Sequence, residues 1–181
     1  MSENRFTPPP RKKNALDNNK LALTTPSPVG NGKQAKLVWS LINNNPRITV
    51  YTGDDAEAGN EKANYGRIVA NLDLPTMYTF FEMVDTANAR EPGFKVKLEN
   101  KNFTFVGGKR SDFPVVQTEL WCGKDKEGCI WMSVTAKDRP MIKFVFAPTD
   151  FHHLFHGDGT PMTKAEASVI FAKGYFGILR Q

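Results

Sequence analysis

The chain has 181 residues, of which 40% are hydrophobic and 24% are charged, a length and composition that suit one globular domain with a tail. No apolar run approaches the length of a membrane span, and the opening residues MSENRFTPPPRKK contain no apolar stretch of the secretory-signal type. The chain has only two cysteines, which without a signal favours a reducing compartment. We therefore expect a cytoplasmic protein with no membrane partner.

The formal net charge of +5 is unevenly distributed. Residues 1–36 carry seven basic and two acidic side chains, so residues 37–181 hold seventeen of each and are neutral as a whole. The sequence pI of about 9.2 therefore describes the N-terminal part. Any surface for nucleic acid on the remainder has to come from local clustering of basic residues.

Residues 1–35 contain many proline, glycine and asparagine residues and few large apolar ones. Such a segment buries too little apolar surface to offset the entropy of ordering it. We predict a flexible basic N-terminal arm over 1–35, with a short ordered piece around Leu16–Leu23, and one globular domain over 36–181.

The globular part begins with strand patterns. Three β-rich runs, KLVWSLI (36–42), RITVYT (47–52) and NYGRIVANLDL (64–74), are separated by an Asn-Asn-Asn-Pro turn and by an acidic loop over 52–62. Asp73 followed by Pro75 then predicts the start of a helix over 74–89. Apolar residues at helical spacing give this helix one buried face: Met77, Phe80, Phe81 and Val84.

A run of strands with short connections follows, at 94–99, 102–107, 114–123, 128–136 and 140–147. The segment 149–159 (TDFHHLFHGDG) suggests a helical turn and a loop, and a Thr163-x-x-Glu166 capping box then opens a helix that ends near Leu179. The expected core-facing stripe of this helix is Ala167, Ile170, Phe171, Gly174 and Ile178. The order predicts an α+β fold with a largely antiparallel meander and two helices, without a clear OB-fold pattern.

Motifs that carry catalysis are missing from the sequence. No nucleophile motif is found, and VGGKRSD lacks the spacing of a phosphate-binding P-loop. A metal site would have to combine His152 and His156 with Cys122 and Cys129, but the cysteine spacing does not fit zinc. Buried thiols with surface histidines are the better interpretation. We expect a non-enzymatic protein with no cofactor and no metal.

Basic and aromatic residues do cluster. Residues 90–110 hold six basic and two acidic side chains, and the three tryptophans lie in predicted strands. Single-stranded nucleic acid is bound by a positive surface along its backbone and by aromatic side chains on which bases stack. The candidate contacts are Arg11, Lys12, Lys13, Lys95, Lys97, Lys101, Phe103, Phe105, Lys109, Arg110, Trp121, Trp131, Arg139 and Lys143. Aromatic residues in strands are more often core residues, and strand lysines are more often merely solvated.

The first predicted hairpin, 94–107, has two possible registers. A two-residue loop at Asn100-Lys101 turns Phe103 and Phe105 toward the core, whereas a loop longer or shorter by one residue places them beside the lysines. Asn-Lys is not one of the dipeptides that define a tight turn, so the sequence leaves this choice open.

The layout resembles small phage-encoded single-stranded-DNA-binding proteins, with a flexible arm and an antiparallel sheet whose strands resemble the runs FKV at 94–96, FTF at 103–105 and WMSV at 131–134. More specifically, it resembles their RNA polymerase cofactor type (Drc). The resemblance implies a fold other than the usual OB barrel, binding to melted promoter DNA and recruitment of a phage polymerase.

We expect a single-stranded DNA-binding protein that acts in replication or transcription, in the host cytoplasm if the chain is phage-encoded. Its expected partners are single-stranded DNA and a phage RNA polymerase or replication protein, and a homo-oligomer is one option that the sequence leaves open. The alternative is an accessory factor that binds other proteins and has no direct contact with nucleic acid. In that case the aromatic residues are core residues or interface anchors.

Overall fold

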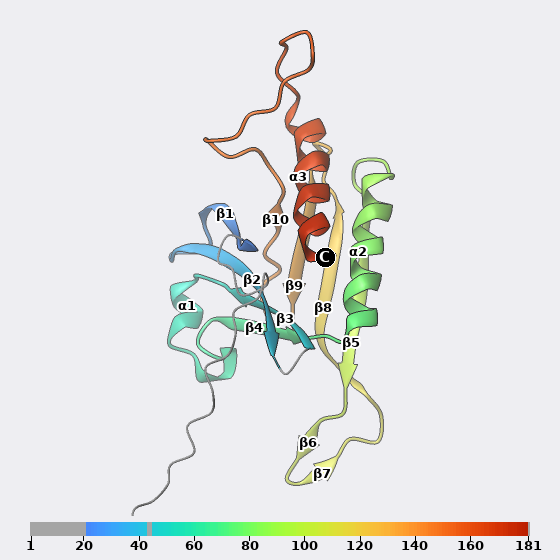
Figure 1. Ribbon diagram of the computed structural model, residues 1–181. Coiled ribbons are helices and arrows are strands. Elements are labelled where there is room, and N and C mark those ends of the chain that lie inside the picture. The colour runs from blue at the N-terminus through green and yellow to red at the C-terminus, as the bar shows by residue number, and fades with distance from the viewer. Residues whose placement is uncertain (1–20, 43–44, 181) are drawn as a thin grey trace, which may run out of the picture.

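The computed structural model describes residues 21–42 and 45–180. The fold is α+β, with antiparallel sheets, a C-terminal helix and no closed barrel in the described part, as the sequence predicts (Figure 1). Sheet A has the order β1-β2-β3-β4, formed by β1 (Leu23–Pro28), β2 (Gln34–Ile42), β3 (Asn45–Tyr51) and β4 (Arg67–Asn71). Sheet B has the order β10-β9-β8-β5, formed by β5 (Lys95–Asn102), β8 (Val115–Lys124), β9 (Ile130–Thr135) and β10 (Phe144–Val145).

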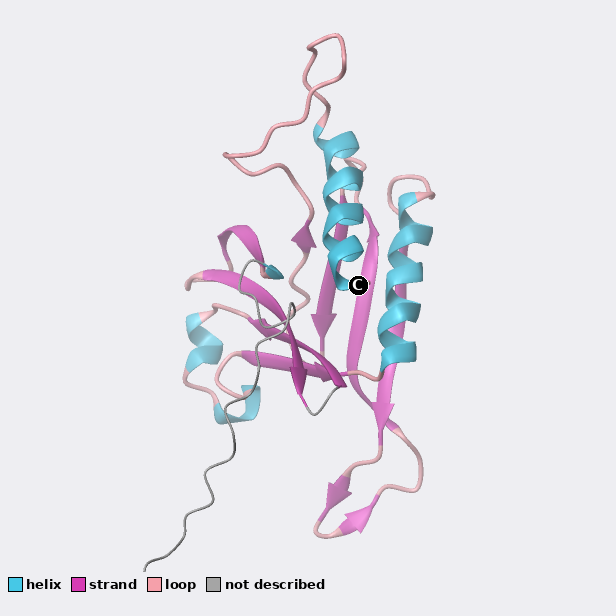
Figure 2. Cartoon of the chain, viewed as in Figure 1, coloured by secondary structure: helices cyan, strands magenta, loops and turns pink. Residues whose placement is uncertain are grey.

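Two long helices lie on the same side of sheet B (Figures 1 and 2). Helix α2 (Leu74–Asn88) begins at Asp73, whose carboxylate accepts a hydrogen bond from the Thr76 amide at 2.7 Å. The predicted apolar face of α2 is buried, with Ala87 added to it. The short elements of the acidic loop are α1 (Asp55–Ala58) and η3 (Glu61–Ala63).

Helix α3 (Lys164–Leu179) has the predicted capping box between Thr163 and Glu166, but the predicted core-facing stripe is only partly correct, since it holds for Ala167 and for the half-buried Phe171. Its buried residues are Ala167, Ser168, Ala172, Phe176 and Leu179, whereas Ile170 and Ile178 are exposed. Apolar residues occur all round this helix, so periodicity alone could not identify the side that packs. Packing against the sheets determines which side of α3 is buried.

One hydrophobic core joins the two sheets and the helices. Trp39 of β2 packs against Phe81 of α2 with ring centroids 5.8 Å apart, and Phe81 packs against Phe176 of α3 at 5.2 Å. On sheet B, Leu120 and Met132 point into the same core. Because successive strand residues alternate between faces, their neighbours in sequence lie on the opposite, outer face of sheet B.

The folded part begins earlier than the predicted boundary at residue 36. β1 pairs with β2, with Leu23 opposite Leu37, and Leu21 is buried. The hydroxyl of Tyr175 in α3 donates to the Leu21 carbonyl at 2.5 Å. Leu21 and β1 therefore belong to the folded domain, and residues 1–20 of the predicted arm lie outside the described residues.

The predicted hairpin over 94–107 is also wrong, because β5 continues through Asn100-Lys101, with a shift of register between them, and pairs with β8. The chain reverses instead at Gly107-Gly108, between β6 (Phe105–Val106) and β7 (Lys109–Arg110). Both glycines have positive φ, 57° and 79°, which suits the tight hairpin turn that Asn-Lys could not favour. Neither of the two registers considered for Phe103 and Phe105 is therefore present.

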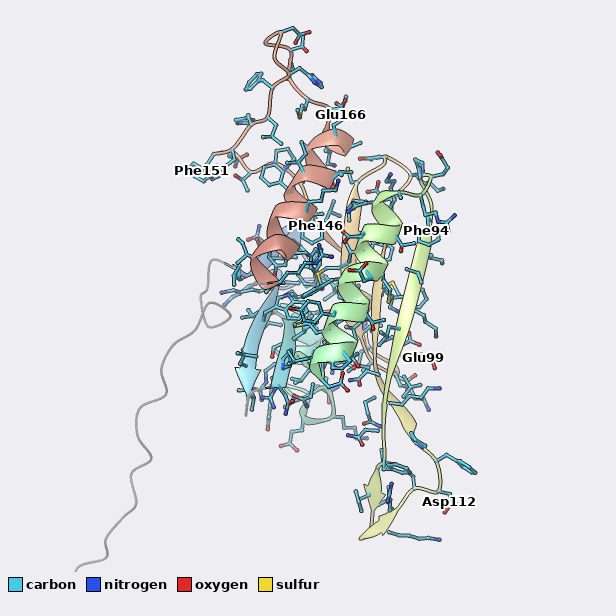
Figure 3. The ribbon with its side chains drawn as sticks, turned by 45° about the vertical axis from the view of Figure 1, so that its right-hand side comes forward. Phe94, Glu99, Asp112, Phe146, Phe151 and Glu166 are labelled. Carbon is cyan, nitrogen blue, oxygen red and sulfur yellow. The ribbon has the colours of Figure 1, made fainter. Side chains whose placement is uncertain are left out.

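A long loop joins β10 to α3 and extends beyond the end of α3 (Figure 2). Residues 149–159 form isolated bridges, Thr149 with His152 and Phe155 with Pro161, in place of the predicted helical turn. The ring of Phe151 in this loop points away from both helices (Figure 3).

Candidate nucleic-acid interface

The outer face of sheet B brings several of the predicted residues together. In the β5–β8 ladder, Lys97 lies opposite Trp121 and Lys95 opposite Gly123. Lys95, Lys97 and Lys101 are exposed, together with Glu99. β9 is buried along its whole length, so the accessible part of this face is formed by β5 and β8. Glu99 points outward from β5 on the side away from α2 (Figure 3).

Two of these lysines, Lys97 and Lys101, form ion pairs with glutamates. The ammonium group of Lys97 lies 2.7 Å from Glu119 and 2.9 Å from Glu99, and Lys101 lies 3.0 Å from Glu99. Hydrogen bonds to Glu119 and then Glu99 raise the pKa of Lys97, and hydrogen bonds from Lys97 and Lys101 lower the pKa of Glu99. The positive charge predicted from the sequence is therefore partly neutralised here. Lys95 has no ion pair within the described residues.

Trp121 is half-buried at the centre of this face. Its indole N–H donates to Glu119 at 2.9 Å, and the ammonium groups of Lys97 and Lys95 lie 5.5 and 6.0 Å from the ring centroid. Cations at such distances are attracted to the ring face. Trp121 thus lies among lysines, as the sequence suggested, with its ring orientation fixed by a carboxylate.

A second group lies on a hairpin that projects from sheet B (Figure 1). This projecting hairpin, residues 103–114, contains β6, β7 and the Gly-Gly turn, and none of its residues belongs to the hydrophobic core. Its stem is closed by the Ser111 amide donating to the Thr104 carbonyl at 2.8 Å and by the Thr104 amide donating to the Ser111 hydroxyl at 3.1 Å. Asp112 lies in this hairpin, far from the helices (Figure 3).

The projecting hairpin combines aromatic rings with cations. The guanidinium of Arg110 stacks on the Phe103 ring, 3.4 Å from its centroid, and Phe105 is paired with Arg110 in the ladder. Side chains opposite each other in a ladder share a face. Phe105 is 69% exposed, and neither Lys109 nor Arg110 has an ion pair among the residues described. The exposed Phe105, Lys109 and Arg110 are therefore available to a ligand, whereas Phe103 is half-buried and stacked against Arg110.

Two residues of the projecting hairpin were missed by the sequence analysis. Phe113 and Val106 are each 79% exposed. A signal existed for Phe113: it is a large apolar residue between Asp112 and Pro114, inside a segment predicted as a turn. An aromatic residue in a polar turn has no core to face, so it is a surface candidate.

Trp131 cannot act as the predicted stacking platform in this conformation. It is only 2% exposed, and the ammonium of Lys143 lies 4.5 Å from its ring centroid. Trp131 pairs with Gly123 of β8 and lies outside the main core, on the outer side of β9. Lys143 itself is exposed.

Arg139 is not free to contact a phosphate. Its guanidinium binds both carboxylate oxygens of Glu57 in α1, at 2.8 and 3.0 Å, and the carbonyl oxygen of Arg67 at 3.1 Å. The side chains of Arg139 and Glu57 are only 13% and 15% exposed. The predicted binding role is replaced by a structural ion pair between the loop after β9 and the loop after β3.

The remaining predictions concern the N-terminus and the cysteines. Arg11, Lys12 and Lys13 lie outside the described residues. Cys122 and Cys129 are both buried free thiols, and burial raises the pKa of Cys122 to about 12 and also raises that of Cys129. Asp125, Glu127 and Cys129 are close enough to share an ion, but the Asp125 carboxylate accepts the Glu127 and Cys129 amides and thereby forms a turn.

Within residues 21–42 and 45–180, no helix has both the length and the apolar character that a membrane crossing requires. Comparison of the chain with models of protein families, with curated proteins and with solved structures found no match.

Proposed function

We propose that this protein binds single-stranded DNA without catalysing a reaction, along the outer face of β5 and onto the projecting hairpin. The observation that carries the proposal is the Arg110–Phe103 stack beside exposed Phe105 and Lys109, on a hairpin outside the core. An isolated two-stranded hairpin is marginal in stability and needs a reason to present apolar rings to solvent. Binding of a ligand that has both aromatic rings and negative charge would explain why the rings are exposed.

The chemistry of the path suits a single strand. Lys95, Lys109 and Arg110, which are exposed and have no ion pair among the described residues, would contact phosphates, and the exposed ring of Phe105 would stack on an unpaired base. Lys101 would join them by exchanging its ion pair with Glu99 for a phosphate. Each stacked base contributes about 1–3 kcal/mol to binding of this type. In a duplex the bases are already stacked on one another, so these rings favour single strands. The resemblance noted above extends the proposal to a phage protein of replication or transcription.

A second candidate function is a protein-interaction accessory factor. It is favoured by the apolar residues that the projecting hairpin and the adjoining start of β8 expose, namely Phe105, Val106, Phe113 and Val115. Exposed apolar groups of this size often mark protein interfaces. The partner would be a phage RNA polymerase or a replication protein, and the tip would insert into a pocket on that partner.

Titration with oligo(dT), followed by tryptophan fluorescence at low and moderate salt, tests the proposal. We expect quenching of Trp121 and an affinity that falls with salt. Replacing Lys109 and Arg110 with alanine should weaken binding and reduce the log-salt slope by about 1.4, because each lost phosphate contact on a single strand contributes about 0.7.

The matched control replaces Lys62 and Lys173, two exposed lysines outside the proposed DNA path, with alanine. It should leave the log-salt slope of binding nearly unchanged. An unchanged slope in the Lys109/Arg110 variant would show that the hairpin does not touch phosphate. Absence of any binding by the natural chain at micromolar concentration would favour the accessory-factor function instead.

A further inference from the structure

A basic pocket lies at the end of sheet B opposite the projecting hairpin. It has a volume of about 420 Å³ and is lined by residues 93–95 at the start of β5, the turn 124–127 after β8, Trp131 and Lys143. Phe94 marks this end of β5, and Asp112 lies beyond the other end (Figure 3). The volume is within the range of pockets that take small molecules.

The pocket carries an excess of free positive charge. Lys95, Lys124, Lys126 and Lys143 all line it, and in the described part of the chain Lys95, Lys126 and Lys143 have no ion pair. Lys124 donates to the Asn88 carbonyl at 3.0 Å.

The two carboxylates of the lining are already engaged. Asp125 accepts two amides of its own turn at 2.9 and 2.8 Å, and Glu127 lies 3.3 Å from the ammonium of Lys164. The amides do not cancel the charge of Asp125, but the four lysines of the lining outnumber its two carboxylates, and three of these lysines have no ion pair among the described residues.

The base of the pocket is formed by closely packed residues of β8 and β9. Trp131 is 2% exposed, and its ring lies 4.5 Å from the ammonium of Lys143. A Cβ atom at Gly123 would lie 2.4 Å from the Phe94 carbonyl oxygen and 3.0 Å from the Trp131 ring, so only glycine allows this close packing. The Trp131 ring is covered, so the pocket selects its ligand by charge and hydrogen bonding, not by stacking.

We propose that this pocket binds a phosphomonoester, either at the end of a DNA strand or on a free nucleotide. A phosphomonoester carries about −1.5 to −2 charges at pH 7, whereas an internal phosphodiester carries one. Three unpaired ammonium groups in one pocket therefore favour the monoester. The proposal for a strand end rests on the proposed function, since the pocket adjoins Lys95 on the same outer face as the DNA path.

The test compares oligo(dT) of about twelve nucleotides with a 5′-phosphate, with a 3′-phosphate and with neither, by fluorescence titration. One terminal phosphate should tighten binding about tenfold, as charge-assisted contacts of this kind do. Lys126→Gln should abolish that gain and leave the affinity for the unphosphorylated strand unchanged. Lys137→Gln, at another exposed turn lysine, should retain the gain.

Calorimetric titration with dTMP, and with thymidine as its uncharged match, distinguishes the free nucleotide from the strand end. Saturable dTMP binding that Lys126→Gln removes, with no binding of thymidine, supports the pocket even if oligo(dT) does not bind and the proposed function fails. Equal affinity for all three oligonucleotides, together with no dTMP binding, overturns the pocket while the proposed function stands. If neither oligo(dT) nor dTMP binds, both proposals are overturned.

Discussion

Arg139 shows how far a single residue can depart from what its sequence neighbourhood suggests. It lies near Lys137 and Lys143 in the sequence, which predicts a phosphate contact. In the structure its partner is Glu57, 82 residues away. Because the bidentate pair is largely shielded from water, breaking it by removing one partner leaves a poorly solvated charge.

We predict that Glu57→Gln lowers the free energy of unfolding by about 1–3 kcal/mol at pH 7. The pKa of Glu57 is lowered from 4.5, chiefly by the hydrogen bond from Arg139. A carboxylate whose folded pKa is depressed stabilises the fold above its unfolded pKa, and this contribution is lost as the pH falls through the folded pKa. The difference between natural and variant chains should therefore shrink below about pH 4.5.

Urea unfolding at several pH values measures this difference. Glu91→Gln, which changes an exposed carboxylate without an ion pair among the described residues, is the control and should have little effect at any pH. A destabilisation that persists undiminished at the lowest pH would mean that ionised Glu57 is not its source. Oligo(dT) affinity should be the same in both variants at pH 7.

At the scale of elements, the projecting hairpin carries proposed binding residues but contributes nothing to the hydrophobic core. Asn102 and Val115 are the last paired residues of the β5–β8 ladder. Everything between them, residues 103–114, contributes no member to the core. Its ordering depends on the two glycines of the turn and on the Thr104–Ser111 contacts.

We predict that replacing residues 103–114 with Asn-Gly, which closes Asn102 and Val115 into a tight hairpin, preserves the fold. The melting temperature should change by only a few degrees, since no buried residue is removed. Affinity for oligo(dT) should fall by about tenfold or more, because both the stacking rings and two cations are lost.

The melting temperature is measured by circular dichroism and the affinity by fluorescence titration. A variant that melts much earlier would show that the hairpin supports the sheet. Full retention of binding would place the DNA path elsewhere on the molecule.

At the scale of the whole molecule, β1 is part of the folded unit. Leu21 is buried, β1 extends sheet A, and Tyr175 of α3 hydrogen-bonds to the Leu21 carbonyl. Leu21, at the start of the described residues, is therefore joined to the C-terminal helix.

We predict that a chain beginning at Leu21 retains the cooperative melt, because it keeps every contact described above. It should bind oligo(dT) more weakly and with a smaller salt slope if Arg11, Lys12 and Lys13 contact phosphates. A chain beginning at Lys36 should melt roughly 10 °C lower or more, since it loses a strand and buried leucine side chain. Equal melting temperatures for the two truncated chains would contradict the structural role of β1.

The sequence by itself determined the α+β class, helix α2 with its buried face, the capping box of α3 and the antiparallel run of β8, β9 and β10 in sheet B. Each of these depends on residues close together in the chain: Asp73 with Thr76, Thr163 with Glu166, or short turns that leave the next strand antiparallel. Of the candidate interface, the local sequence put Lys109 and Arg110 in a turn, where they are exposed, but it left open which side Phe105 faces.

Only the tertiary structure decided the rest. It buried Trp131 beneath Lys143, bound Arg139 to Glu57, turned Phe176 of α3 inward and paired β5 with β8. The physical reason is the same in each case: the energy comes from a partner distant in sequence, which no local pattern encodes. The charge that remains free, at the two ends of β5, is the part of the predicted interface that this packing leaves available to a ligand.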